Sequence, residues 1–461
     1  MRFIAGSDWA PKPGQLLDWA PTAHTVAAAR QAPVSPVPPS FLQRDHINAV
    51  IAGRSQGRTH RGYTCSAITV DSDLDIAALT EAITDFVRAH EGLRSSFRVV
   101  DGQVERYVTD AADVDFEPIE ISDPTADPVA HLATRLPTEA VFDAFPGCAF
   151  GVVRREGSFD LYYGVDHAFG DGSSQVLGLL ELLARYRGEA GHPLVASAPG
   201  SHLDYILDEY ARAGEVTPDS HTVALWREVL TNSGGAIPAF PLPLGADDAP
   251  QPVTITTDTL ADAATTEGLA ALAKSHGTSL ISVIYAGLAL AGHALTGTDW
   301  YATATVLSTR GNAEHRTSQG WYCNFAPIGF AVGDTSLDEA IDAAAAAVAA
   351  SKVAAQQPVH AALGILLAEG AIDPAAAASP QMVNYLDFRW FPAPAGARDM
   401  VVFTGEGRTR NASLWISRDA DGLRISTQRP DNPVAAESIP RFFAQAREIL
   451  AAGVTATTGA H

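Results

Sequence analysis

The segment from residue 148 to residue 188 constrains the fold of this chain more than any other. Residues 148–154 and 159–165 have the pattern of two hairpin strands, with Glu156-Gly157-Ser158 at the turn. One face of the second strand carries Phe159, Leu161, Tyr163 and Val165, and the other carries Asp160, Tyr162, Gly164 and Asp166. Helical spacing follows in Val176, Leu177, Leu179, Leu180 and Leu183 until Gly188. The segment predicts a strand, a turn and a helix in succession, within a mixed α/β fold.

The turn between that strand and that helix reads His-Ala-Phe-Gly-Asp-Gly at 167–172. A histidine at a strand end can face a cleft, and its ordinary pKa near 6.5 lets it accept and return a proton near neutral pH. We expect Asp171 to hold the turn and Gly172 to allow backbone angles that other residues avoid. Ser173 or Ser174 can cap the helix. By spacing alone, an ordinary turn histidine that hydrogen-bonds its neighbours explains His167 equally well.

Composition narrows the classes of partner. The 461 residues suit two domains or two large subdomains, and 46% hydrophobic with 18% charged residues indicates a globular protein. The formal net charge of −22 argues against nucleic acid, because a polyanion would be repelled and no basic stripe is visible. The same charge argues against electrostatic binding to an anionic membrane surface.

Cysteine usage and the apolar runs indicate the compartment. Cys65, Cys148 and Cys323 form no CxxC pair, which predicts neither a disulfide framework nor a zinc site and fits a reducing compartment. The N-terminus lacks an apolar signal core, and the longest apolar run, Leu280 to Leu295, is short for a membrane span. We expect a cytoplasmic protein without a stable membrane anchor, which meets the inner membrane face only when it handles a lipid.

The chain divides into two halves around a break in its pattern. Residues 1–40 are rich in Trp and Pro, which predicts an extended arm on the surface. Residues 189–250, rich in Gly, Pro and Ser around two helical patterns, are interpreted as a crossover. The expected N-terminal lobe covers 1–190, and the crossover and C-terminal lobe cover 191–461.

Most other elements are predicted from periodicity. Strands are expected at 64–70, 93–100, 252–258, 301–308, 381–390, 412–418 and 423–428. Helices are expected from Asp73 or Asp75 to about residue 90, and around 203–213, 221–231, 264–276, 279–295, 337–355 and 436–452.

Three segments carry a family resemblance. His167-x-x-x-Asp171-Gly172 after a strand resembles the HHxxxDG motif of the condensation-domain superfamily, which includes chloramphenicol acetyltransferase-like enzymes, peptide-synthetase condensation domains and the polyketide-associated (Pap) acyltransferases. Residues 88–97 (RAHEGLRSSF) are similar to its RHxxLRxxF segment, and residues 320–328 (GWYCNFAPI) resemble its GxxxNxxP segment. The order and the approximate spacing agree, and the resemblance covers the whole chain. Residues 1–40, 240–245 and 431–438 are most similar to the actinobacterial Pap acyltransferases.

This resemblance implies two chloramphenicol acetyltransferase-like lobes in a V, with the active histidine in a tunnel between them. It also implies direct transfer: His167 takes the proton of an acceptor hydroxyl, the oxygen attacks a thioester carbonyl, and a thiolate leaves. No covalent acyl-enzyme is needed, because no Gly-x-Ser-x-Gly elbow occurs at a strand–helix turn. We expect a monomer, since the two lobes bury each other.

The implied reaction is O-acyl transfer of a fatty or polyketide group to a hydroxyl of a sugar or lipid alcohol, for example in a trehalose-based glycolipid. The donor is acyl-CoA or an acyl carrier protein with a phosphopantetheine-linked acyl group, and neither a metal nor another cofactor is expected. Docking of an acidic carrier protein on this acidic chain would need a local basic patch, which favours CoA. An amide-forming condensation enzyme and a non-catalytic carrier-binding or lipid-binding protein remain as alternatives.

The resemblance assigns the other site residues. Asp171 is implied to be structural and paired with an arginine. Arg94 is the first candidate, Arg88 and Arg310 are alternatives, and Arg94 also fits an ordinary surface charge. Asn324 is implied to bind the acceptor or line the tunnel, although a turn asparagine fits equally well. Trp321 and Tyr322 are expected either in the tunnel wall, where they would bind substrate, or in the core.

The sequence departs from the family pattern at two places. Asp166 replaces the first histidine of HHxxxDG, and its carboxylate is expected to alter the local charge or the acceptor site. The DFGWG segment is not recognisable, and residues 424–430 (RISTQRP) stand in about that place. Tunnel closure and donor contacts depend on that segment in the family.

Overall fold

The computed structural model describes residues 1–123, 126–236, 238–247, 249–372, 381–392, 394–405 and 407–458. The chain forms two compact units, each of which contains a seven-stranded sheet. Unit 1 comprises Met1–Ala211, Arg310–Cys323 and Phe391–Glu406. Unit 2 comprises Arg212–Thr309, Asn324–Trp390 and Gly407–His461.

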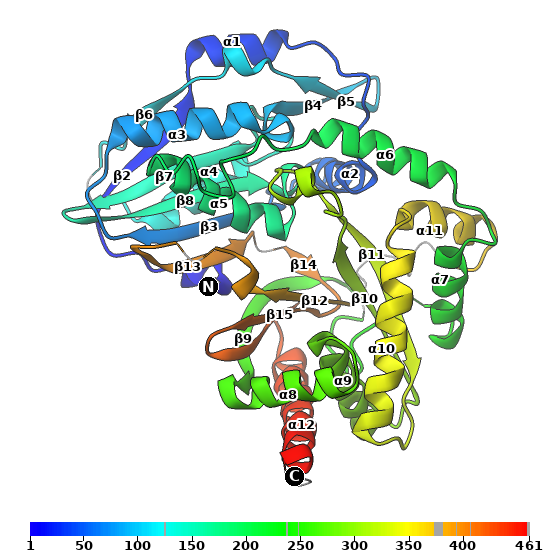
Figure 1. Cartoon of the computed structure of the whole chain (residues 1–461). Helices are drawn as coiled ribbons and strands as arrows, with labels where there is room; N and C mark the ends of the chain where they lie inside the picture. The colour runs from blue at the N-terminus through cyan, green and yellow to red at the C-terminus, as the bar shows by residue number, and fades with distance from the viewer. Residues whose placement is uncertain are drawn as a thin grey trace. The chain divides into compact units, whose positions relative to one another are not determined.

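The sheet of unit 1 has the strand order β1-β13-β3-β8-β7-β2-β6 (Figure 1). Its strands are β1 (Arg2–Ala5), β2 (Gln15–Pro21), β3 (Tyr63–Val70), β6 (Phe116–Glu120), β7 (Cys148–Arg155), β8 (Ser158–Asp166) and β13 (Ala397–Thr404). Only the β1–β13 pair is parallel. Two further strands, β4 (Ser95–Val100) and β5 (Gln103–Val108), form a separate hairpin. The helices are α1 (Ala23–Gln31), α2 (Phe41–Ser55), α3 (Ile76–Ala89), α4 (Pro128–Glu139), α5 (Gly172–Tyr186) and most of α6 (His202–Gly214).

Strand β8 is buried on both faces, as its position inside the sheet requires. Phe159, Leu161, Tyr163 and Val165 pack in the same hydrophobic cluster as the apolar side chains of α3 and α5. On the opposite face, Tyr162 packs in a second cluster with Leu132 and Leu136 of α4. The predicted alternation of side chains along residues 159–165 is therefore confirmed, and it fixes the direction in which His167 leaves the strand.

The predicted extended arm at residues 1–40 is wrong. Two of its segments, β1 and β2, are strands of the sheet, and α1 lies between β2 and the proline-rich stretch at 33–39. The indole of Trp19 is buried and donates to Thr80 Oγ1 at 2.8 Å. Prolines did not prevent these strands because they lie in the connections or, as with Pro21, at a strand end.

The sheet of unit 2 has the strand order β11-β10-β12-β15-β16-β9-β14. Its strands are β9 (Gln251–Asp262), β10 (Trp300–Ser308), β11 (Cys323–Ala331), β12 (Met382–Asp387), β14 (Arg408–Thr409), β15 (Ser413–Asp419) and β16 (Gly422–Pro430). The helices are α7 (His221–Asn232), α8 (Ala263–Ser275), α9 (Leu280–Thr296), α10 (Leu337–Ala354), α11 (Val359–Ala368) and α12 (Pro433–Thr458).

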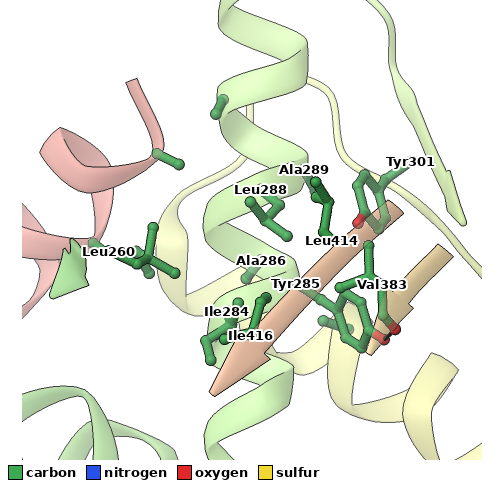
Figure 2. Close-up of a cluster of buried hydrophobic side chains, with 14 of the residues drawn as sticks. Leu260, Ile284, Tyr285, Ala286, Leu288, Ala289, Tyr301, Val383, Leu414 and Ile416 are labelled. Carbon is green, nitrogen blue, oxygen red and sulfur yellow. Dashed lines mark hydrogen bonds between the residues drawn. The ribbon is translucent and has the colours of Figure 1, made fainter. Parts of the chain in front are cut away.

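Helix α9 forms the centre of the unit 2 core, as its apolar sequence predicts. Figure 2 shows Ile284 and Leu288 of α9 beside Leu414 and Ile416 of β15, and all four side chains are buried. Tyr285, also buried, donates its hydroxyl to the carbonyl of Val383 at 3.3 Å. In the described part of the chain no single helix is long and apolar enough to cross a membrane, although α8 and α9, bent by 103°, pass that test as a pair.

Each unit consists of several separate segments of the chain, so the units differ from the lobes expected at 1–190 and 191–461. Residues 310–323 and strand β13 belong to unit 1 although they lie far along the sequence. Strand β13 pairs with β3 and β1, and those backbone hydrogen bonds place it in the first sheet. Composition alone does not reveal that segments late in the chain belong to the first unit.

Candidate functional site

His167 lies at the end of β8, as predicted, and begins a short 3-10 turn (His167–Phe169) before α5. Its backbone N–H donates to the carbonyl of Gly62 at 2.9 Å, which fixes the strand exit. Asp171, and neither Ser173 nor Ser174, is the N-cap of α5, because its Oδ1 accepts from the N–H of Ser174 at 2.7 Å. The hexapeptide is thus a strand–turn–helix junction with a partly exposed histidine at its start.

Asp171 ties α5 to the segment 310–322. Its Oδ1 lies 3.1 Å from Arg310 Nη2, and its Oδ2 accepts from the N–H of Tyr322 at 2.9 Å. Burial alone would raise the pKa of Asp171, but Arg310 and the backbone N–H groups of Ser174 and Tyr322 lower it below its ordinary value. Asp171 is therefore an ionised structural group, and its oxygens are used within the protein.

The first candidate for the partner of Asp171, Arg94, is wrong, and Arg310 takes that place. Arg94 donates instead to the carbonyls of Arg88 and Thr109, at 3.2 and 2.7 Å. Arg88 is occupied by the Val114 carbonyl and Asp115. Arg310 also donates to the carbonyls of His315 and Ser318, at 2.8 and 2.7 Å, so one guanidinium holds the whole loop.

Gly172 does not serve the purpose expected of it. Its φ is not in the left-handed region, and a Cβ at this position would meet nothing within 4 Å. The backbone of the turn therefore does not require a glycine at this residue. Open space at the first residue of α5 is the property that the structure shows.

Trp321 lies against the imidazole of His167. The two ring centroids are 4.3 Å apart, with 25° between the planes. The backbone N–H of Trp321 donates to Nε2 of His202 at 3.2 Å, and its indole N–H points at Sγ of Cys323 at 3.1 Å. The stacked indole restricts the rotation of His167 and presents an apolar wall beside it.

His167 is arranged to remain neutral. Burial lowers its pKa, and the nearby His46 ring lowers it further, against the opposing effects of Asp166 and Asp171. Its Nδ1 is buried and has no hydrogen-bond partner among the residues that the structure describes. Nε2 is therefore the nitrogen left to meet a ligand, and a neutral imidazole can accept a proton there.

Asp166, the departure from the family motif, is fully buried and faces two histidines. Its Oδ1 accepts from Ala168 N–H at 2.7 Å and lies 2.9 Å from Nε2 of His46. Nε2 of His60 lies 2.9 Å from Oδ2 but makes its hydrogen bond with the Ala140 carbonyl, at 3.1 Å. Burial alone would raise the pKa of Asp166, but His46 and His60 lower it to about 2. Asp166 is an internal counter-charge and has no exposed atom to offer a substrate.

Two other residues expected to bind substrate have structural contacts inside the protein instead. The Tyr322 ring is completely buried among Tyr205, His202 and His315. Asn324 lies in unit 2, where its Nδ2 donates to the carbonyls of Ala355 and Gln357 at 2.9 and 2.6 Å. Its Oδ1 accepts from the N–H groups of Phe325 and Val359. Asn324 thus joins the start of β11 to the α10–α11 connection, as a residue of a strand and not as the turn asparagine considered from the sequence.

Sequence reasoning missed the groups that support His167 from α2. The signal for that helix was present, because Ser40 and Gln43 form a capping box at its start. Gln43 Nε2 donates to the carbonyl of Ala168 at 2.7 Å, so this buried side chain holds the histidine turn. His90 was also missed: it lies 2.8 Å from the buried carboxylate of Glu181 and accepts from Gln319 N–H at 3.2 Å.

The three cysteines are buried, and burial raises the pKa of each thiol, which makes them inert at neutral pH. No group of three His, Cys, Asp or Glu side chains suited to a metal ion occurs among the described residues. At the junction itself, burial and His46 lower the pKa of the partly exposed His167.

Two units of mixed helices and sheets, with an HxxxDG junction whose histidine is partly exposed, define the condensation type of acyltransferase fold. The Condensation domain family matches residues 55–361 of this chain, and the chain belongs to that family. It is an acyltransferase related to the mycobacterial Pap enzymes.

The comparisons with individual proteins agree. The chain is 30% identical to "2'-acyl-2-O-sulfo-trehalose (hydroxy)phthioceranyltransferase PapA1" of Mycobacterium tuberculosis, over 97% of this chain and 88% of that protein. It is 28% identical to "Trehalose-2-sulfate acyltransferase PapA2" of Mycobacterium bovis, over 96% and 95% of the two chains. The solved structure "PapA2 acyl transferase" has the same fold, with a TM-score of 0.89, 24% identity and coverage of 98% and 100%.

Proposed function

We propose that this chain is an O-acyltransferase that moves a fatty or polyketide acyl group from a thioester to a hydroxyl of a sugar or lipid alcohol. A trehalose-based glycolipid is the acceptor class that we favour. The observation that carries the proposal is the partly exposed imidazole of His167 at the end of β8, whose pKa is lowered by burial and by His46. The names of the relatives PapA1 and PapA2 refer to sulfated trehaloses, which supports the choice of a sugar acceptor.

The mechanism needs one base and no covalent intermediate on the protein. Nε2 of His167 takes the proton of the acceptor hydroxyl, and the oxygen forms a bond to the thioester carbonyl carbon. The tetrahedral intermediate then collapses, the carbon–sulfur bond breaks, and the leaving thiolate recovers the proton from the imidazolium. General-base catalysis of this kind contributes about 10²–10⁴-fold to the rate, and holding both substrates in place contributes much of the rest.

The net charge of the chain favours one class of acyl donor. A coenzyme A thioester needs only a few local cations for its phosphates, whereas an acidic carrier protein must approach a chain of net charge −22. We therefore favour acyl-CoA as the donor, with a phosphopantetheine-linked carrier protein as the second source. No cofactor beyond the donor enters the mechanism.

The experiment is thiol release from a panel of acyl-CoA donors, with and without sugar and lipid alcohols. Native protein, His167→Ala and the control His131→Gln are compared, with folding checked by circular dichroism. We expect release that depends on the acceptor and falls by about 10²–10⁴-fold in His167→Ala alone. Undiminished transfer in His167→Ala would overturn the mechanism.

The remaining outcomes separate the alternatives. Transfer only from a carrier-protein thioester would change the donor, and product formation only with amines would make the chain an amide-forming condensation enzyme. Tight binding of an acyl ligand without any transfer would favour a non-catalytic carrier or lipid-binding protein.

A further inference from the structure

The carboxylate of Asp166 precedes the proposed base directly and is built into the protein from two directions. Asp166 is completely buried. Its Oδ1 accepts a hydrogen bond from the N–H of Ala168 at 2.7 Å, within the turn that carries His167. The same oxygen lies 2.9 Å from Nε2 of His46 on α2. A buried carboxylate is costly without such partners, so Asp166 and its donors form one unit.

His46 is oriented by its surroundings as well as by Asp166. Its ring is packed against Gly62, where a Cβ would lie 2.4 Å from Cε1 of His46. The ring centroid lies 6.1 Å from that of His167 and 6.0 Å from that of Trp321. One turn earlier on α2, Gln43 holds the Ala168 carbonyl. Helix α2 therefore holds the histidine turn through Gln43 and places the imidazole of His46 near that of His167.

We propose that Asp166 and His46 are a positioning pair that sets the orientation and the charge state of His167. This inference rests on the proposed role of His167 as the base. The hydrogen bond from Ala168 to Asp166 fixes the turn, and the hydrogen bond between Asp166 and His46 fixes the second ring. When His46 is protonated, its positive charge opposes a second positive charge on His167, so the base stays free to accept the acceptor's proton.

Three charged groups act on His167 among the residues that the structure describes, and a fourth group acts through one of them. Asp166 precedes it on β8, His46 faces it from α2, Asp171 caps α5, and Arg310 neutralises Asp171. The carboxylate of Asp171 forms an ion pair with Arg310, with 3.1 Å between Oδ1 and Nη2. The carboxylate of Asp166 contacts His60 in addition to His46. His46 is the group in this set whose charge lowers the proton affinity of His167. Replacing His46 by a neutral side chain is therefore predicted to raise that affinity.

The test follows the titration of the His167 ring by NMR in the full-length protein labelled with ¹³C-histidine. The variants are His46→Gln, which removes the charge, and His46→Lys, which keeps a cation and a donor for Asp166. His131→Gln is the matched control, because His131 also lies 2.9 Å from a buried carboxylate, that of Asp18. We expect the His167 midpoint to move to higher pH in His46→Gln, and to return toward the native value in His46→Lys.

Activity provides a second readout. In His46→Gln the acid limb of the kcat/KM profile should move to higher pH in parallel with the NMR midpoint, and the rate on the alkaline plateau should fall because the contact that orients the site is lost. The proposal is overturned if the midpoint in His46→Gln equals that in His131→Gln, or if His46→Lys shifts as far as His46→Gln. The titration needs no turnover, so an inactive native protein would refute the proposed function and leave this test intact.

A folding defect in His46→Gln does not remove the test. The native protein still shows the direction of the effect, because the midpoint of His167 should lie below the ordinary histidine value. A midpoint at or above that value would overturn the pair.

Discussion

The indole of Trp321 lies flat on the imidazole of His167, with centroids 4.3 Å apart and 25° between the ring planes. The contact joins two segments that are far apart in the chain, β8 and the loop before β11. Three groups hold that loop: Asp171 through Tyr322, His202 through Trp321, and His90 through Gln319. The proposed base is therefore oriented by a side chain that is itself held at several points.

Trp321→Ala is predicted to lower kcat/KM by about 10- to 100-fold, because a misoriented base loses that much without any change in its chemistry. Trp321→Phe, which retains a flat ring, should lose much less. The measurement is acyl transfer under saturating donor. Trp390→Ala is the control, since Trp390 is 68% exposed and should leave the rate unchanged. Equal rates for Trp321→Ala and the native protein would mean that the stacked ring does not position His167.

The ion pair of Asp171 predicts a difference between two arginines. Arg310→Gln leaves a buried carboxylate without its cation and should destabilise the fold by about 3–5 kcal/mol. Arg94→Gln removes hydrogen bonds to two carbonyls of a half-buried side chain and should cost about 1–2 kcal/mol. Urea unfolding at pH 7, followed by tryptophan fluorescence, orders the two variants. The reverse order would restore Arg94 as the residue that supports the junction.

Sequence periodicity predicted the elements that form one-sided or fully buried runs. Helices α3, α6, α7, α8, α9 and α10 and the β7–β8 hairpin lie within a few residues of their expected bounds. The arm at 1–40 failed because proline density says little about a short strand whose prolines lie in its connections. The helix α2 was missed although its capping box was visible, and with it the support for His167.

The site itself was predictable only where its residues are close in the chain. His167 and Asp171 follow from one hexapeptide, but their partners come from tertiary structure. His46 lies 120 residues before Asp166, and Arg310 lies 139 residues after Asp171. No local pattern distinguishes Arg310 from Arg94 or Arg88, because the choice depends on which loop folds back onto α5. Asp166 replaces a histidine of the family motif, and the structure shows that its carboxylate contacts two other histidines, His46 and His60.

A histidine in unit 2 predicts a dependence of stability on pH. The ring of His276 lies 2.8 Å from Asp342 and 3.2 Å from Asp338 on α10. The hydrogen bond to Asp342 raises the pKa of His276, and Asp338 adds to this effect. A raised pKa in the folded state gives stability that is fully present below the ordinary pKa and is lost as pH rises through the raised value.

The unfolding midpoint of native protein should therefore exceed that of His276→Gln most at pH 5.5–6. The difference should shrink as the pH rises toward 9, when the ring becomes neutral. Thermal unfolding at constant ionic strength measures both. His24→Gln serves as the control, because the His24 side chain is 68% exposed and its single carboxylate contact is 3.2 Å long. A difference that grows with pH would contradict the assignment of these contacts as ion pairs.

Asn324 provides the sharpest separation between a structural and a binding role. Its amide makes four hydrogen bonds within unit 2, two as donor and two as acceptor. Asn324→Asp keeps the shape but replaces both donated hydrogen bonds with a charge facing the carbonyls of Ala355 and Gln357. That change should destabilise the fold by about 2–4 kcal/mol, because two buried carbonyls lose their partner and a carboxylate is buried without a cation. Denaturant unfolding should register this loss, while in the fraction that remains folded the KM for the acceptor stays at the native value. An acceptor-binding role requires the opposite result, a raised KM in a protein of unchanged stability.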